Sequence, residues 1–350
     1  MASSNNNHHS KTIWLMGHWL SQNMGDRYQP TIVAKYLSQY IDLSQVTFIN
    51  FFPDITSMST VVNNQTYPVV APGDVNPSKA RLIILVTGSI NKDAAYMKWL
   101  PHYLQNKNLD RIIIWGGFTG IITPSSYKLG LEILADRRIT FWARSWLDLN
   151  LYRDMFGRDG RGCLAGDPMA GWILLHNNDN NDKDHPTSPK ILIPSIYAWR
   201  RYPEKWNQLI ELFPRVISID SHADQELFLK YPKIESVNDP EKIIPLLLTS
   251  SHVVSARLHS ALLATLLNIP TTMVIHDDAM PGTASFKFEA IGGNGIGKGL
   301  PLCQTITGKE LSDNIFSYTP DLERENNQKY LRLTEESFIT IIRLVREYLE

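Results

Sequence analysis

Short hydrophobic runs alternate along the chain with longer segments in which hydrophobic residues recur at helical spacing. In the first half these runs are rich in isoleucine, valine and aromatic residues, as expected of strands buried on both faces. They cover residues 12–17, 46–50, 82–88, 111–117 and 139–144. Helix-like segments lie between most of them, at residues 30–41, 92–105 and 124–135. This alternation predicts a parallel sheet with helices on both of its faces.

The alternation stops at residues 176–190, HNNDNNDKDHPTSPK, and then resumes. This stretch has no aliphatic residue and cannot bury surface, which predicts an exposed linker. Beyond it, strands are predicted at residues 191–195, 216–220, 252–256 and 271–276, with helices at 199–213, 224–230 and 240–248. We therefore expect an α/β protein with two doubly wound, Rossmann-like domains that face a cleft. Its expected parts are a disordered start at 1–10, domains at 11–175 and 191–332, and a C-terminal helix at 333–350.

Composition and charge narrow the class of protein. Of the 350 residues, 43% are hydrophobic and 20% are charged, as in a globular protein. The formal net charge of −1 argues against nucleic acid or an anionic membrane surface as the main partner. The polar start is unlike a signal peptide, no run of 18 apolar residues occurs, and Cys163 and Cys303 lack a Cys-x-x-Cys spacing. We expect a cytoplasmic protein without stable membrane insertion, disulfide framework or zinc site.

The sequence VVSARLHSALLATLLNIP, residues 253–270, places an arginine and a histidine where a predicted strand becomes a helix. Arg257 and His259 fall at the carboxyl end of the strand and in the first helical turn. That turn has unpaired N–H groups and a partial positive charge, so together with Arg257 it suits a phosphate or carboxylate. His259 can give and take a proton near neutral pH. The alternative, equally open, is that both residues are structural: Arg257 binds a backbone carbonyl and His259 packs in the core.

Three further stretches follow predicted strands of the first half. In QNMGDRYQP, residues 22–30, Gly25 allows the backbone to approach a ligand closely, and Asp26 can cap the helix that follows. Arg144 ends the strand at 139–144 and could hold an anion or form a salt bridge. In AGDPMAGW, residues 165–172, Asp167 stands at the end of another short strand.

The loop after the last predicted strand, residues 276–293, holds a cation and two adjacent carboxylates. Lys287 lies between two phenylalanines and could reach into the cleft. Asp277 and Asp278 would point to different sides of an extended chain, so a metal there needs ligands from elsewhere. No Gly-x-Gly-x-x-Gly, Gly-x-Ser-x-Gly, His-Glu-x-x-His or Walker motif is present. We expect neither a metal nor a cofactor.

The segments NMGD, ARSWLD, GDPMA and SARLHSALLATLLNIP, in this order and followed by a lysine-containing loop, resemble the polysaccharide pyruvyl transferase family. They span residues 13–293, and the Arg-Leu-His helix with its Asn-Ile-Pro exit is the most specific of them. The chain departs from the family in its turns TGSI and WGGF, and in the distance from His259 to the loop lysine. The resemblance implies a GT-B-like fold, phosphoenolpyruvate as donor, a sugar or polysaccharide-precursor acceptor, a pyruvate ketal as product and no metal.

The resemblance also implies roles for individual residues. It assigns phosphoenolpyruvate binding to Arg257, Arg144 and Lys287, proton transfer to His259, and the acceptor side to Gly25 and Asp26. Two alternatives stay open. One is a GT-B glycosyltransferase that uses the same cleft for the diphosphate of a nucleotide sugar. The other is a sugar-binding protein without catalysis, which the joint presence of the arginine and the histidine disfavours.

Overall fold

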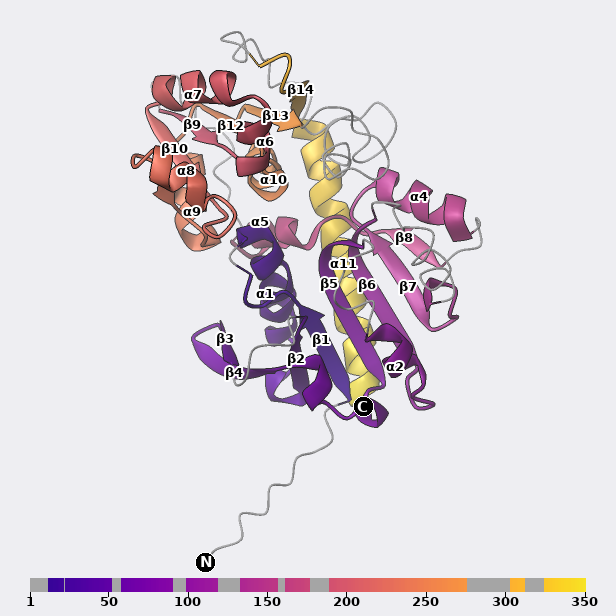
Figure 1. The fold of residues 1–350 in the computed structure, drawn as a ribbon. Helices are drawn as coiled ribbons and strands as arrows, with labels where there is room; N and C mark the ends of the chain where they lie inside the picture. Colours follow the sequence, from indigo (N-terminus) through magenta and orange to yellow (C-terminus); the bar gives the residue numbers. More distant parts are fainter. Residues whose placement is uncertain are drawn as a thin grey trace, which may run out of the picture.

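Two β-sheets organise the chain, one in each half (Figure 1). A computed structural model describes residues 12–21, 23–51, 58–90, 99–118, 133–156, 161–176, 189–275, 303–311 and 324–350. Within these residues the first sheet has the strand order β3-β4-β2-β1-β5-β6-β7-β8, and the second has the order β11-β10-β9-β12-β13-β14. Strand order reverses beside the first strand of each sheet, which is the doubly wound arrangement predicted from the alternation of strands and helices.

The first sheet is parallel except for one hairpin. Its strands are β1 (Ile13–Gly17), β2 (Val46–Asn50), β3 (Met58–Val62), β4 (Gln65–Val70), β5 (Leu82–Ile90), β6 (Arg111–Phe118), β7 (Ile139–Ala143) and β8 (Gly162–Leu164). The predicted strands of this half are confirmed, and the β3–β4 hairpin is an addition at the sheet edge. Its two-residue turn, Asn63 and Asn64, has φ angles of 49° and 64°, which asparagine tolerates and which suit the twist of a hairpin.

The second sheet is parallel throughout its described strands. These are β9 (Lys190–Ile193), β10 (Arg215–Ser218), β11 (Glu235–Ser236), β12 (His252–Ser255), β13 (Thr271–Ile275) and β14 (Gln304–Thr307). All four strands predicted for this half are present. The predicted linker falls between α5, which ends at His176, and β9, which starts at Lys190, and most of it lies outside the described residues.

The helices fill the connections between the strands. They are α1 (Met24–Ser38), α2 (Leu100–Leu104), α4 (Trp146–Phe156), α5 (Gly171–His176), α6 (Ile196–Arg201), α7 (Pro203–Leu212), α8 (Gln225–Lys230), α9 (Pro240–Leu248), α10 (Leu258–Leu266) and α11 (Arg324–Leu349). Short 3-10 turns are η1 (Leu43–Gln45), η2 (Pro72–Asp74), η3 (Pro77–Lys79) and η5 (Pro168–Ala170). The helix predicted at 124–135 lies mostly outside the described residues, as does the first part of the one at 92–105.

Helix α1 begins six residues before the predicted start at residue 30. Proline is common in the first turn of a helix, and the predicted segment starts at Pro30. In the structure Pro30 lies inside the helix, and its ring packs against Gly17 at the end of β1. The earlier start places the NMGD segment in the first helical turn instead of in a loop.

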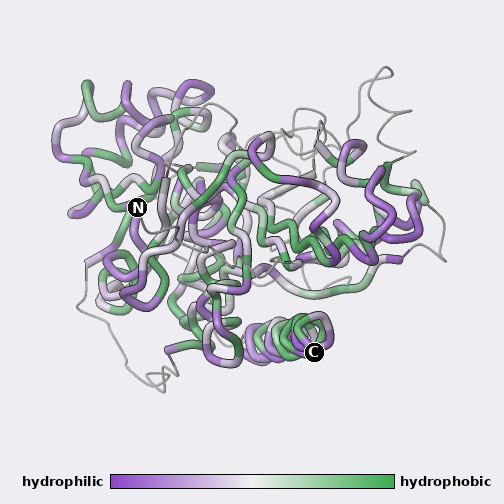
Figure 2. Tube along the Cα trace, turned by 90° about the horizontal axis from the view of Figure 1, so that it is seen from below, coloured by the Kyte–Doolittle hydropathy of each residue, from purple (hydrophilic) through white to green (hydrophobic). Residues whose placement is uncertain are grey.

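Helix α11 connects the two halves of the molecule. It was predicted at 333–350 but begins at Arg324, because its first turns are polar and carry little hydrophobic signal. At this end Asn327 donates hydrogen bonds to the carbonyl oxygen of Thr265 and to Oδ1 of Asn268, at the end of α10. Further along, Phe338 stacks on Tyr36 of α1, so the helix runs along the first sheet (Figure 1). Hydrophobic and hydrophilic residues alternate around its coil, which Figure 2 shows nearly end-on.

One cluster of buried hydrophobic residues extends through both halves. It includes Ile13 and Leu15 of β1, Ile191 and Ile193 of β9, and the inner faces of α1, α10 and α11. A continuous apolar core of this kind fixes how the two sheets face each other. Helices α1 and α10 lie between the sheets, so the first turns of both helices meet at the junction.

Candidate active site

Helix α1 presents Gly25 and Asp26 at the junction of the two sheets. Its N-cap is Asn23, whose Oδ1 accepts hydrogen bonds from the backbone N–H groups of Gly25 (3.0 Å) and Asp26 (3.4 Å). The prediction that Asp26 caps this helix is therefore wrong, because Asn23 does so. The carboxylate of Asp26 lies beside Gly88 of β5, where an added Cβ would be 2.5 Å from Oδ1. It is partly exposed and makes no side-chain hydrogen bond within the described residues.

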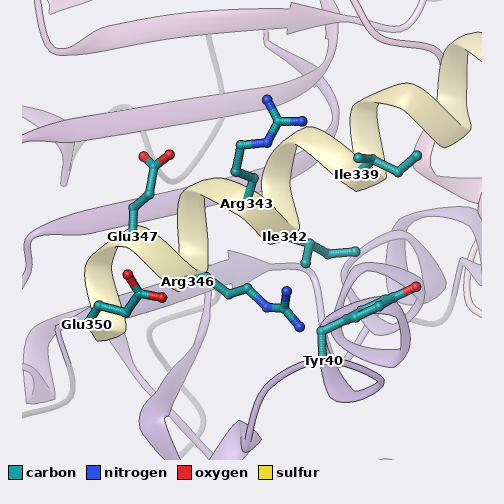
Figure 3. A pocket seen from close by; sticks show the side chains of 7 residues that line it. All are labelled: Tyr40, Ile339, Ile342, Arg343, Arg346, Glu347 and Glu350. Carbon is teal, nitrogen blue, oxygen red and sulfur yellow. The ribbon is translucent and has the colours of Figure 1, made fainter.

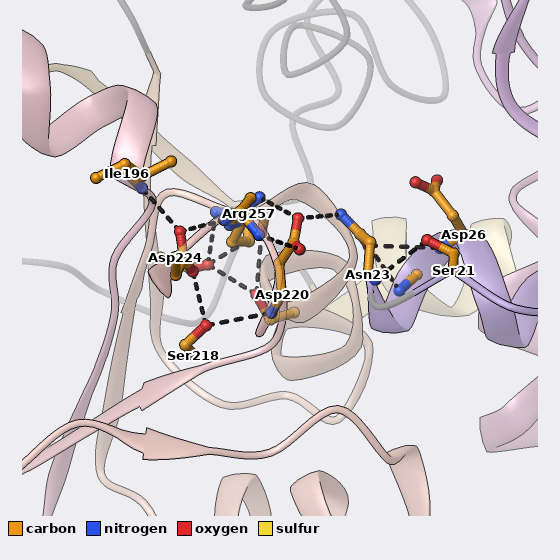
Figure 4. Close-up of polar contacts among 12 residues, drawn as sticks. Ser21, Asn23, Asp26, Ile196, Ser218, Asp220, Asp224 and Arg257 are labelled. Carbon is orange, nitrogen blue, oxygen red and sulfur yellow. Dashed lines mark hydrogen bonds and ion pairs between the residues drawn. The ribbon is translucent and has the colours of Figure 1, made fainter. Parts of the chain in front are cut away.

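Arg257 is the N-cap residue of α10, and two carboxylates of its own half hold its guanidinium (Figure 4). Nη1 donates to Oδ2 of Asp220 at 3.0 Å, and Nη2 donates to Oδ1 of Asp224 at 2.6 Å. Asp224 is fully buried and also accepts hydrogen bonds from the N–H of Ile196 and the hydroxyl of Ser218. The guanidinium thus ties together the carboxyl ends of β9, β10 and β12. A donor anion at Arg257, as predicted, would meet a guanidinium whose two Nη atoms are already paired and whose buried Nε has no hydrogen-bond partner among the described residues.

The same cluster joins the two halves. The side-chain amide of Asn23 donates to Oδ2 of Asp220 at 3.2 Å, and the N–H of Met24 donates to the carbonyl oxygen of Ile219 at 2.9 Å. Asn23 and Asp220 form an isolated antiparallel bridge between the start of α1 and the segment after β10. One oxygen of Asp220 therefore accepts from Arg257 of the second half and from Asn23 of the first.

His259, in the first turn of α10, lies against the first half. A Cβ added to Gly25 would be 1.6 Å from Nδ1, so only a glycine lets the imidazole lie this close to α1. The other ring nitrogen, Nε2, lies 3.0 Å from Nε2 of Gln29 and 3.6 Å from Oδ2 of Asp167. The side chain of His259 is 9% exposed. Both ring nitrogens of this histidine therefore face residues of the other half.

Asp167 is buried next to that imidazole. Its Oδ1 accepts hydrogen bonds from the N–H of Met169 (2.9 Å) and from Nε2 of Gln29 (3.1 Å), whereas its Oδ2 has no hydrogen-bond partner within the described ranges. Burial alone would raise the pKa of this carboxyl. The opposing effects of His259, Arg144 and the hydrogen bonds outweigh burial and lower the pKa to about 2. Asp167 is therefore ionised near neutral pH.

Arg144 lies at the end of β7, as predicted, and is only 2% exposed. Its Nη1 donates to the carbonyl oxygen of Gly88 at 2.6 Å and its Nε donates to Oδ2 of Asp148 at 3.3 Å. The guanidinium lies flat against Gly117 of β6, where a Cβ would be 2.3 Å from Nη2. That nitrogen has no hydrogen-bond partner in the part of the chain that the structure describes. Arg144 thus forms the salt bridge that the sequence analysis offered as one alternative, and its Nη2 remains as a hydrogen-bond donor for an anion.

Burial raises the pKa of Asp148, and Arg144 and several hydrogen bonds oppose this rise. The carboxylate accepts from the hydroxyl of Ser145 and the N–H of Phe118 as well as from Arg144. These contacts hold the guanidinium in one position at the carboxyl ends of β6 and β7.

Tyr330 of α11 completes the site, and sequence reasoning missed it. Its hydroxyl donates to the carbonyl oxygen of Arg144 at 2.9 Å and accepts from the N–H of Asp167 at 2.8 Å. The side chain is fully buried. The C-terminal helix therefore fixes the backbone at the ends of β7 and β8, where two candidate residues stand.

Lys287, Asp277 and Asp278 lie outside the described residues. Among the residues that the structure describes, no group of three or more histidine, cysteine or carboxylate side chains is arranged to hold a metal ion. In the same part of the chain, no helix is long and apolar enough to cross a membrane.

A pocket of about 390 Å³ lies elsewhere, on the surface of α11 (Figure 3). It is lined by Tyr40, Ile339, Ile342, Arg343, Arg346, Glu347 and Glu350. Tyr40 follows the last turn of α1, whereas Gly25 is in the first, and a 15-residue helix is about 22 Å long. This pocket is therefore separate from the junction where His259 and Arg257 lie.

Solved structures of other proteins share the arrangement of the two sheets. The wall teichoic acid polymerase TagF, in a variant with a histidine replaced by alanine, superposes with a TM-score of 0.56 at 14% identity, over 97% of this chain and 90% of that one. A UDP-GlcNAc 2-epimerase from Neisseria meningitidis, bound to UDP-GlcNAc, superposes with a TM-score of 0.50 at 10% identity, over 95% of this chain and 99% of that one. The chain has a GT-B-like fold.

A further TagF variant, soaked with CDPG, gives a TM-score of 0.55 at 14% identity, over 97% of this chain and 90% of that one. No family model matches the chain, and no curated protein matches it. The GT-B-like architecture confirms the predicted fold class, with two doubly wound sheets and a C-terminal helix.

Proposed function

We propose that the protein is a transferase of glycan assembly that moves a group from a phosphate-containing donor to a sugar hydroxyl. The observation that carries this proposal is the meeting of His259 from the second half with Gly25, Gln29 and Asp167 from the first. All four follow the carboxyl ends of parallel strands, where ligands bind in doubly wound sheets. The imidazole, at the boundary of the two halves, is suited to transfer a proton between two substrates.

The charged side chains at the junction indicate which substrate binds there. The described side chains there include two guanidinium groups, each already paired, and a larger number of carboxylates: Asp26, Asp148, Asp167, Asp220 and Asp224. Carboxylates accept hydrogen bonds from hydroxyl groups, so this surrounding suits a sugar acceptor. Asp26 is partly exposed and makes no side-chain hydrogen bond within the described residues, so it is the residue placed to hold the acceptor hydroxyl.

A nucleotide-activated donor fits the site best. The diphosphate of such a donor carries about two negative charges, and the unused Nη2 of Arg144 and the first turn of α10 offer N–H groups to it. Structures with the same fold include an epimerase bound to UDP-GlcNAc and a polymerase soaked with CDPG. This reading corresponds to a GT-B glycosyltransferase or a closely related transferase.

Phosphoenolpyruvate is the second candidate donor. What favours it is that all four segments of the pyruvyl transferase resemblance converge at the junction, represented by Gly25, Arg144, Asp167 and His259. This donor carries about three negative charges, so it needs more cationic groups than the paired guanidinium groups supply. Lys287 would have to provide one of them.

A donor panel tests the proposal. The protein is incubated with UDP-GlcNAc, CDPG or phosphoenolpyruvate and a set of sugar acceptors, and release of nucleotide or inorganic phosphate is measured. Thermal shift with each donor alone reports binding, because a ligand at 100 times its Kd stabilises the folded state by about 2.7 kcal/mol. His259→Ala serves as the matched variant, and circular dichroism checks that it is folded.

We expect nucleotide release that depends on an acceptor and that falls by at least about 100-fold in His259→Ala. If phosphate is released from phosphoenolpyruvate and neither nucleotide donor is consumed, phosphoenolpyruvate is the donor and the nucleotide-activated donor is excluded. If none of the three donors shifts the melting temperature or is consumed, the transferase proposal is wrong. Near-normal turnover in His259→Ala would remove the histidine from the mechanism while leaving the reaction class in place.

A further inference from the structure

The imidazole of His259 is held by the half of the molecule to which it does not belong. The two contacts of Nε2 come from Gln29 on α1 and from Asp167 before η5. Nδ1 lies against the backbone of Gly25. In the sequence, Gln29 stands 230 positions from His259. The orientation of the ring therefore depends on the junction and not on α10 alone.

Asp167 is itself held firmly. Its Oδ1 accepts from the N–H of Met169, and its own N–H donates to the hydroxyl of Tyr330. The residue is 1% exposed. A carboxylate fixed in this way can hold a neighbouring side chain in one orientation, as second partners of catalytic histidines do.

One buried acceptor oxygen beside Nε2 has no hydrogen-bond partner among the described residues. It is Oδ2 of Asp167, which lies 3.6 Å from Nε2. A buried acceptor without a donor is costly, and a buried carboxylate oxygen especially so. The contact between Gln29 and His259 has two forms, because the amide can donate to a bare Nε2 or, turned by 180°, accept from a protonated one. In the first form the same amide nitrogen also donates to Oδ1 of Asp167; in the second the amide oxygen takes its place, and Oδ1 keeps the N–H of Met169 as its donor. A proton on Nε2 supplies the donor that Oδ2 of Asp167 lacks and selects the second form.

We propose that Asp167 is a positioning residue for His259: it holds a proton on Nε2 and leaves Nδ1, beside Gly25, as the nitrogen that works on the substrate. The inference rests on the proposed transferase function. In the reaction, the O–H bond of the acceptor breaks and an N–H bond forms at Nδ1, while the oxygen lone pair attacks the donor. The leaving phosphate departs with its bonding electrons. The imidazole is then cationic, Asp167 supplies the opposite charge, and the proton on Nδ1 passes to the phosphate or to water.

This arrangement also makes the site depend on the contact between the halves. The group that holds Nε2 belongs to the first half, and the histidine belongs to the second. Separation of the halves would free the ring to rotate and would remove the carboxylate from Nε2. The site is therefore complete only when α1 and η5 lie against α10.

The tautomer of His259 tests this inference without any substrate. Nitrogen-15 NMR of histidine-labelled full-length protein distinguishes a protonated from a bare ring nitrogen, and the spectrum of His259→Gln assigns the signals. In the neutral form of the wild-type ring we expect the proton on Nε2 and a bare Nδ1. A neutral ring with its proton on Nδ1 would overturn the inference, whether or not a donor has been found.

Substitution of Asp167 supplies the second test. Asp167→Asn should shift the neutral ring of His259 away from the Nε2-protonated form. It should also lower kcat by about 10²- to 10⁴-fold, the range of general acid–base catalysis. The KM of the donor should change by less than about threefold. Asp136→Asn, which removes a partly exposed carboxylate paired with Arg138, is the control and should leave both unchanged. An Asp167→Asn protein that is folded, with the wild-type tautomer and kcat, would refute the positioning role.

Discussion

Gly25 offers the sharpest test of how the two halves meet. It lies in the first turn of α1, and a Cβ at this position would be 1.6 Å from Nδ1 and 2.3 Å from Cγ of His259. An ordinary contact between a Cβ and a neighbouring heavy atom starts at 3.4 Å. In Gly25→Ala the imidazole or the helix must therefore retreat by the difference, about 1.8 Å.

The expected effects on stability and on activity differ in size. Alanine is favoured over glycine inside a helix by about 1 kcal/mol, and overpacking costs about 1–3 kcal/mol. The net loss of stability is then at most about 2 kcal/mol, and the melting temperature falls by a few degrees. A displacement of about 1 Å in a reacting group costs about 100-fold in rate, so kcat/KM should fall by at least that factor.

The assay compares turnover and thermal unfolding of wild type, Gly25→Ala and Gly73→Ala. Gly73 is the matched control, because a Cβ there would lie 3.4 Å from Trp99, an ordinary contact. It should change neither turnover nor the melting temperature by a measurable amount. If Gly25→Ala keeps its kcat within threefold of wild type, His259 does not lie against α1 in the working protein, and the reasoning fails.

Two further predictions concern the buried charges of the junction. Arg257→Ala leaves Asp220 and Asp224 without their cationic partner, so the free energy of unfolding, measured in urea, should fall by about 3–5 kcal/mol. A loss below about 1 kcal/mol would show that the guanidinium does not hold the ends of β9, β10 and β12 together. The second concerns Asp167, whose pKa of about 2 in the folded protein lies below the ordinary 3.8, because His259, Arg144 and the hydrogen bonds outweigh burial. Its ionised form therefore stabilises the fold above about pH 4 by about 2 kcal/mol, and this contribution is lost as the pH falls from about 4 to about 2. The stability difference between wild type and Asp167→Asn should shrink over that range in urea titrations, and a difference independent of pH would contradict the assigned pKa.

The strands could be predicted from the sequence because burial on both faces leaves a plain signal. Runs such as residues 82–88 and 111–117 are almost purely hydrophobic, and they became β5 and β6. The β3–β4 hairpin was not predicted because its strands are half exposed and lie at the sheet edge. Its Asn-Asn turn, between residues of alternating polarity, was the signal that could have found it. The early start of α1 was not predicted; proline is typical of a first helical turn, yet the helix already begins six residues before Pro30.

The candidate site was predictable only in part. Arg257, His259 and Arg144 follow strand ends, Gly25 lies in the first turn of the helix after β1, and the structure brings their segments together as the doubly wound pattern implies. Their partners could not be predicted, because nothing local marks them. From the sequence, Gln29 is an ordinary helix residue and Tyr330 is part of a polar stretch. Tyr330 also stands 163 positions along the chain from Asp167, whose N–H donates to its hydroxyl.

Helix α11 follows the second sheet in the chain but spends most of its length on the first. Phe338 packs between Tyr36 and Trp115, and Gly171 of α5 leaves room for its ring. A cut between the two sheets would therefore expose the aromatic surface of the first half and leave α11, without its packing partners, on the second. The two halves, produced as separate polypeptides, would still bind each other through α11. The boundary between the sheets is thus not the boundary between two independent folding units.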